Sequence, residues 1–182
     1  MCVVTPILTS AACDFSRAGI AVLYVAQCAD IAVDGLTFDA DRAISAITMV
    51  SGKVFKRIEF EKNTAFFNQA KTKIKSSTNV AQTISFVEAG LSNEVRNALE
   101  DLNCNCCLFV IVKDNSGQLH AAGLSYDSVN ETYAFEDMRT GEGSANTGAD
   151  PTADSAEFIE TIVANVRFYA NHLSLAESAI PV

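Results

Sequence analysis

The sequence predicts a mainly β protein with one α-helix, built as an antiparallel β-sandwich or barrel. At least six stretches have a strand-like pattern, and a single short stretch has helical spacing. Turn residues such as Asp114 to Gly117 separate consecutive strand-like stretches. Strands that follow one another through tight turns are typical of antiparallel sheets packed face to face.

The length and the composition predict one self-associating domain, 1–182. A chain of 182 residues buries enough surface to form its own core. Apolar residues make up 49% of the chain and charged residues 19%, which is below the usual share of about a quarter. We therefore expect neighbouring subunits to cover part of the surface. A well-packed monomer is the alternative.

The net charge of −9 and the pI of about 4.6 argue against a protein that grips nucleic-acid phosphates, which requires clustered Lys and Arg. The chain has no apolar run long enough for a membrane helix. Its first residues lack the basic and apolar regions of a signal peptide. These observations predict a protein of cytosolic origin with no membrane segment.

The six cysteines are predicted to be reduced and mostly buried rather than paired, because the core is large enough to fold without disulfides. Their spacing does not match a zinc site, and neither His120 nor His172 lies near a second ligand in the sequence. We expect no metal. The cysteines are Cys2, Cys13, Cys28, Cys104, Cys106 and Cys107.

The first third of the chain is predicted to contain an arm, a central strand, a loop and a hairpin. Residues 1–15 form the arm, and Ile20–Ala26 is apolar at every position, as in a strand covered on both faces. Asp34-Gly35 and further acids predict a surface loop over 30–41. Ile44–Val50 and Val54–Glu61 are expected to pair as a hairpin across Ser51-Gly52-Lys53.

The second arm of that hairpin is expected to have one buried and one wetter face. Val54, Ile58 and Phe60 would lie on the buried face. The wetter face would carry Phe55, Arg57, Glu59 and Glu61.

A strand over 64–75 places Lys71, Lys73 and Lys75 on one face and Thr72 and Ile74 on the other. Lysines on a strand edge can block random strand addition, and this is one interpretation. In an acidic protein they can also pair with an acidic strip on an identical neighbour. We expect the lysine strip, together with Arg57, Glu59 and Glu61, to form a subunit or ring interface.

The rest of the chain alternates strands and turns around one helix. The helix is predicted over 93–102, with Leu91, Val95, Leu99 and Leu102 on its apolar side. Other predicted elements are a strand over 80–89, a buried strand over 107–112 with its partner over 118–124, a weaker strand over 126–136, a long loop over 138–154 and a β-rich stretch over 156–170.

The sequence contains no catalytic pattern, so we expect no enzyme activity and no cofactor. A cysteine hydrolase needs a thiolate beside a histidine, and a serine hydrolase needs an elbow such as G-x-S-x-G. Gly141 to Ala145 is rich in glycine, but no basic residue follows it, as a phosphate-binding loop requires.

Several segments, in order and at similar spacing, resemble the tail-tube proteins of tailed phages that infect Bacteroidetes. The resemblance covers residues 19–172. It rests on Gly19–Ala26, Ile47–Met49, Phe60–Ala65, Gly90–Ser92 with the helix that follows, and Val110–Gly117.

The resemblance implies a sandwich or barrel of tail-tube type and a structural virion protein that assembles in the bacterial host cytoplasm. Six copies would form a ring, and rings would stack through a hairpin or loop at about 62–79 and through the N-terminal arm. DNA would pass through the lumen without specific binding, and an acidic lumen would suit this role. Other tail or neck proteins would be partners. The alternatives are a single neck, hub or tail-terminator ring, and a non-assembling β-sandwich that binds a small molecule or a protein.

Overall fold

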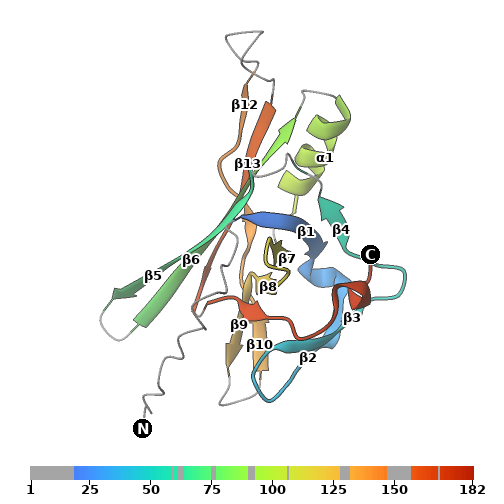
Figure 1. The fold of residues 1–182 in the computed structure, drawn as a ribbon, viewed down its shortest axis with the longest axis vertical. Helices are drawn as coiled ribbons and strands as arrows, with labels where there is room; N and C mark the ends of the chain where they lie inside the picture. Colours follow the sequence, from blue (N-terminus) through green and yellow to red (C-terminus); the bar gives the residue numbers. More distant parts are fainter. Residues whose placement is uncertain are drawn as a thin grey trace.

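The computed structural model describes most of the chain in one arrangement of antiparallel strands with one helix (Figure 1). This confirms the mainly β fold class with a single helix among the residues that it describes. Those residues are 19–58, 60, 64–74, 77–89, 93–105, 107–127, 132–146, 157–167 and 169–182.

The central sheet has the strand order β14-β8-β7-β1-β4, and every pair in it is antiparallel. The predicted buried strands β1 and β7 lie side by side in it, with apolar side chains toward both faces. Asp114 closes the predicted turn between β7 and β8, because its Oδ1 accepts hydrogen bonds from the N–H groups of Ser116 and Gln118. The strands are β1 (Ile20–Gln27), β4 (Lys56–Ile58), β7 (Leu108–Asp114), β8 (Leu119–Ala122) and β14 (Asn171–His172).

A second sheet is built on the long strands β5 (Phe66–Ile74), β6 (Ser77–Ala89) and β13 (Glu157–Val166). The short strands β11 (Arg139–Thr140) and β12 (Ser144–Asn146) pair one after the other with the same edge of β13. The sheet is therefore four strands wide. The segment predicted as a loop over 138–154 contains β11 and β12, and residues 147–156 lie outside the described part.

Helix α1 (Asn93–Asn103) confirms the helix predicted over 93–102. Leu99 is buried in the core, and Leu102 packs against it. The helix ends in a turn in which Asn105 N donates to Leu102 O, while the Asn105 side chain donates to Asp101 O at 2.9 Å. Of the other predicted apolar positions, Leu91 lies outside the described residues, as does the side chain of Val95.

Two hairpins cover the other face of the central sheet. One joins β2 (Ile31–Phe38) to β3 (Ile44–Met49). The second joins β9 (Leu124–Asp127) to β10 (Thr132–Phe135), so the single weak strand predicted over 126–136 is a pair. The surface loop predicted over 30–41 is wrong. An irregular register between Ile31 and Leu36 lets β2 accommodate Asp34, which has a φ of 54°, without ending the strand.

The hairpin predicted between 44–50 and 54–61 is also wrong, because β3 pairs with β2 and β4 pairs with β1. The turn after β3 carries the chain from one sheet to the other. The predicted faces are reversed at the start of this segment. Phe55 is 1% exposed, and its ring lies 5.9 Å from that of Phe109, whereas Val54 is 38% exposed.

Two hydrophobic cores lie on opposite faces of the central sheet, so the molecule has three layers where the sequence predicts two packed sheets. The first core lies against the second sheet and includes Leu23, Val25, Ile84, Phe86, Val110 and Ile162. The second core lies against the two hairpins and includes Tyr24, Leu36, Phe55, Phe109, Ile111 and Leu124.

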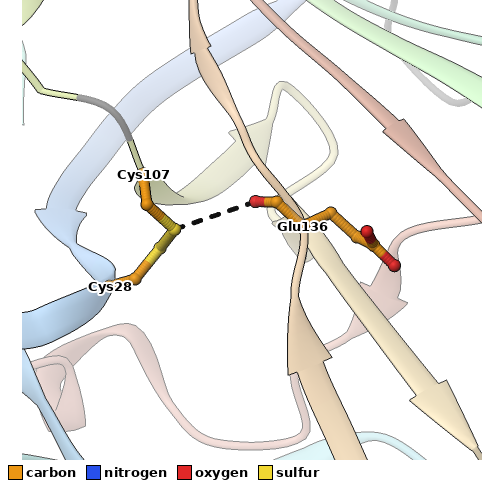
Figure 2. The surroundings of a disulfide bond; sticks show 3 residues. All are labelled: Cys28, Cys107 and Glu136. Atoms are coloured by element: carbon orange, nitrogen blue, oxygen red, sulfur yellow. Dashed lines mark hydrogen bonds between the residues drawn. A yellow bond between two sulfur atoms is a disulfide. The ribbon is translucent and has the colours of Figure 1, made fainter.

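The prediction of reduced, mostly buried cysteines is wrong for Cys28 and Cys107, and Cys104 is reduced as predicted but exposed. Cys28 and Cys107 form a disulfide with their Cα atoms 5.6 Å apart, and Cys104 is a free, exposed thiol. The physical reason is strand register: Gln27 lies opposite Leu108, so the residues just beyond the pair also meet. Figure 2 shows the bond beside Glu136, whose carbonyl oxygen lies 3.8 Å from Cys107 Sγ. Cys2, Cys13 and Cys106 lie outside the described residues.

Candidate assembly interface

The β5–β6 hairpin extends away from the rest of the molecule, with the end of β5 and the start of β6 farthest from it (Figure 1). The two strands pair without interruption from Phe66–Ser85 to Ile74–Ser77. Lys71 and Lys73 are exposed and lie on the same face of β5, as predicted. Lys75, the third predicted interface lysine, lies outside the described residues.

Two glutamines connect this hairpin to the rest of the molecule through hydrogen bonds. Gln82 is fully buried, and its Oε1 accepts a hydrogen bond from the Gly123 N–H at 2.9 Å. Gln69, its neighbour across the strands, accepts from the Ala170 N–H at 2.7 Å. Farther along the hairpin, Lys71 Nζ lies 5.9 Å from the centre of the Tyr169 ring, which is 51% exposed. The hairpin is therefore anchored at its base and open toward its end.

The structure does not bring Arg57 together with the lysines. Arg57 lies on β4 in the central sheet, whereas Lys71 and Lys73 lie on β5 in the second sheet. The other two predicted interface residues, Glu59 and Glu61, lie outside the described residues. The predicted interface set is therefore divided between two sheets.

Arg57 belongs to a polar cluster that holds the C-terminal segment on the central sheet. Glu177 accepts hydrogen bonds from Tyr24 Oη and from Lys113 Nζ, both at 2.6 Å. Burial and the hydrogen bond to Glu177 raise the pKa of Tyr24 to about 12. The hydrogen bonds from Lys113 and Tyr24 lower the pKa of Glu177, and the charge of Arg57 acts in the same direction. No sequence pattern indicates this cluster, since Tyr24 and Glu177 are far apart in the chain.

The two histidines, which are far apart in the sequence, meet in the structure. His120 of β8 and His172 of β14 are directly opposite each other, with ring centroids 4.7 Å apart. His120 Nε2 lies 3.4 Å from Asp114 Oδ2. Burial and the nearby His120 lower the pKa of His172. Within the described residues, no group of three or more potential ligands is arranged to hold a metal ion.

A groove of about 730 Å³ lies between α1 and the strands β1 and β4. Its apolar wall includes Val25, Ile58, Leu99 and Leu102, and Asp30 and Lys53 at its rim form an ion pair of 2.9 Å. Such a groove can accommodate a small apolar ligand or a side chain of a partner.

In the described part of the chain, no helix is long and apolar enough to cross a membrane.

Both sheets end in open edges. In the described part of the chain, β5 pairs only with β6, and β4 pairs only with β1. Phe66, at the start of β5, is 52% exposed. An open edge strand can add a strand from another chain, and lysines on it limit unspecific pairing. These edges are where neighbouring copies could extend the sheets.

On its three long strands, the outward face of the second sheet has no charged side chain between its ends. We call it the uncharged face, defined by the even-numbered residues from Phe66 to Thr72, the odd-numbered residues from Asn79 to Val87 and the odd-numbered residues from Ile159 to Asn165. On the fourth strand, Arg139 of β11 lies opposite Val163 on this face and forms an ion pair with Asp137. Alternation along each strand shows which residues share one side of that strand. Only the strand pairing shows that the three sides form one face.

No family model, no curated protein and no solved structure matches this chain.

Proposed function

We propose that the protein is a structural virion protein whose copies form six-membered rings, and that the rings stack into a phage tail tube through which DNA passes. The observation that carries the proposal is the second sheet. It is four strands wide, it has open edges, and it continues into a hairpin that extends beyond the rest of the molecule.

Ring geometry supports the proposal. If six copies joined their second sheets edge to edge, about 24 strands at a spacing of roughly 4.8 Å would give a circumference of about 115 Å. Tilting the strands relative to the ring axis would increase it. A closed ring would pair the open edges of β5 and of β11 and β12, removing the risk that exposed edges pair with wrong partners. The bore of such a ring would be wide enough for a DNA duplex.

The hairpin supports stacking of the rings. Because β5 and β6 extend past the two cores, their outer ends can reach a neighbouring ring while their bases remain fixed by Gln69 and Gln82. Lys71 and Lys73 would then meet acidic groups of an identical neighbour, whose net charge is −9. A head-to-tail contact of this kind repeats and builds a filament.

The test is the assembly state of the purified protein, measured by size-exclusion chromatography with light scattering and by electron microscopy. We expect rings and tubes. The double variant Lys71→Glu/Lys73→Glu should keep a β-rich circular dichroism spectrum while tubes give way to smaller species. Arg96→Glu, an exposed charge reversal on α1, is the control and should still form tubes. A parent protein that stays monomeric at high concentration would overturn the proposal.

The groove beside α1 favours a second candidate, a non-assembling module that binds an apolar ligand. The same experiment separates the two, because this candidate requires a stable monomer. A single neck, hub or tail-terminator ring is distinguished from the tube by electron microscopy, where isolated rings would appear without stacks.

A further inference from the structure

The charges on the three long strands of the second sheet have an unusual distribution. An antiparallel sheet with one covered face normally carries its charged residues on the other, solvated face. Here Lys71 and Lys73, Glu88 of β6 and Glu160 of β13 all lie on the side that continues the first core. The opposite side is the uncharged face. Beside it on β11, Arg139 lies opposite Val163 and is neutralised by an ion pair with Asp137.

This face is also the only extended sheet surface that the described part of the chain leaves without a covering layer. The central sheet has a hydrophobic core on each side, so neither of its faces is free. The second sheet has the first core on one side only. On its other side Asn68, Ala70 and Thr72 are exposed, as is Asn165 of β13. Ser85 in the middle of β6 is 8% exposed, because it lies between Phe66 and Thr161 of the neighbouring strands.

We infer that the uncharged face lines the central passage of the assembled ring and that this lining is neutral. The inference rests on the proposed function and deepens it. Joining the second sheets through their open edges leaves their broad faces free, and the face opposite the first core is the one that can turn toward the axis. The net charge of −9 taken alone favours an acidic lumen, whereas the side chains of this face favour a neutral one.

The composition of the face favours a water-filled passage over a contact between two copies. The centres of protein interfaces are enriched in large aromatic residues and Arg, which supply most of the binding energy. The uncharged face has a single aromatic residue, Phe66, at its edge, and its middle consists of small or β-branched residues such as Ala81, Thr83 and Val163. Asn79 Nδ2 already donates to Asn165 Oδ1 at 3.1 Å within the face.

A neutral lining has a specific consequence for the DNA duplex that would pass along it. Phosphate groups bind clustered cations through release of counterions, and they are repelled by clustered carboxylates. Hydroxyl and amide groups carry no net charge, so they neither attract nor repel phosphates at long range. The duplex would therefore slide without being held, and its passage would depend little on ionic strength.

The first test is chemical access to one cysteine on this face. In a Cys104→Ser background, Asn68→Cys places a thiol on the uncharged face, and Asn97→Cys places one on exposed α1 as the matched control. We expect both thiols of dissociated subunits to react with a small maleimide and with a maleimide on a long polyethylene glycol chain. In tubes, the cysteine at position 97 should react with both reagents, whereas the one at position 68 should react with the small reagent only.

Two outcomes in tubes would overturn the inference. Reaction of the cysteine at position 68 with the large reagent would place the face on the outside, and loss of reaction with both reagents would bury it between copies. The Cys104→Ser protein without an added cysteine measures the reaction of the remaining cysteines, and this signal is subtracted. If no rings or tubes form at all, the proposed function fails, and that result is distinct from either outcome.

The second test measures the neutrality itself with a short DNA duplex. Tubes of the parent protein should leave the duplex in the supernatant at low and at high salt. Thr83→Lys adds a ring of cations to the lining and should retain the duplex at low salt, whereas Asn97→Lys should not. Equal retention by the two variants, or retention by the parent tubes, would contradict a neutral lining.

Discussion

Glu160 is a carboxyl group held where its ionised form is disfavoured. Its side chain is almost completely buried on the core side of β13, and this burial raises its pKa. The loop between β11 and β12 covers it so closely that a Cβ atom added to Gly143 would lie 2.7 Å from Glu160 Oε1. The three nearest atoms all belong to the end of the Glu160 side chain, so a larger residue at position 143 would displace this carboxyl group.

The raised pKa of Glu160 predicts how its replacement depends on pH. A group whose pKa is raised in the folded state favours folding at low pH, and this contribution is lost as the pH rises through the folded pKa. Glu160→Gln removes the buried charge at neutral pH. At pH 7 we expect the free energy of unfolding of the variant to exceed that of the parent by up to about 1 kcal/mol, so that it unfolds at a higher urea concentration. Near pH 4 the two proteins should be equally stable.

Urea unfolding followed by circular dichroism at the two pH values measures the difference, with Glu142→Gln, an exposed carboxyl in the same loop, as the control. A Glu160→Gln variant that is less stable than the parent at pH 7 would show that the carboxylate has a stabilising partner. In that case burial would not be the dominant effect on this group.

At the scale of elements, local patterns predict structure wherever the neighbours along the chain decide it. The continuous apolar run of β1, the helical spacing of α1 and the turn after β7 were each predicted from fewer than fifteen residues. The elements that were predicted wrongly depend on distant partners. β4 pairs with β1 instead of β3. β2 continues through an irregular register that no pattern in its sequence predicts.

The same limit applies to the candidate interface. The exposed lysine face of β5 follows from alternation within one strand and was predicted. The place of Arg57 beside Tyr24 and Glu177, and the shared outward side of β5, β6 and β13, depend on which strands pair. Those relations appear only when the sheet order is known.

The disulfide between Cys28 and Cys107 joins two elements and predicts a measurable stabilisation. It closes a loop across a sequence separation of 79 residues, which restricts the unfolded chain, and such a bond typically contributes about 2–4 kcal/mol. Cys28→Ser/Cys107→Ser should lower the free energy of unfolding by about this amount. Urea unfolding measures the change.

Cys104→Ser is the matched control, because Cys104 is exposed and free. It should change the free energy of unfolding by less than about 0.5 kcal/mol. If the double variant unfolds at the same urea concentration as the parent, the bond does not form in the purified protein. The sequence-based expectation of reduced cysteines would then be restored.

At the scale of the whole molecule, the proposed assembly would use different surfaces for ring closure and for ring stacking. Ring closure would use backbone hydrogen bonds along the open strand edges, whereas ring stacking would use the exposed lysines near the end of the β5–β6 hairpin. Backbone pairing between strands depends weakly on salt. Attraction between exposed charges is screened once their separation exceeds the Debye length.

This difference predicts that stacking and ring closure respond separately to salt. The Debye length falls from about 10 Å at about 0.1 M salt to about 3 Å at about 1 M. We therefore expect tubes to shorten toward single rings as salt is raised, while the rings persist. Sedimentation velocity with electron microscopy of the same samples measures both species, and Arg96→Glu should show the same dependence. Tubes that remain unchanged at about 1 M salt would show that stacking relies on apolar or backbone contacts, so Lys71 and Lys73 would be ordinary solvated lysines.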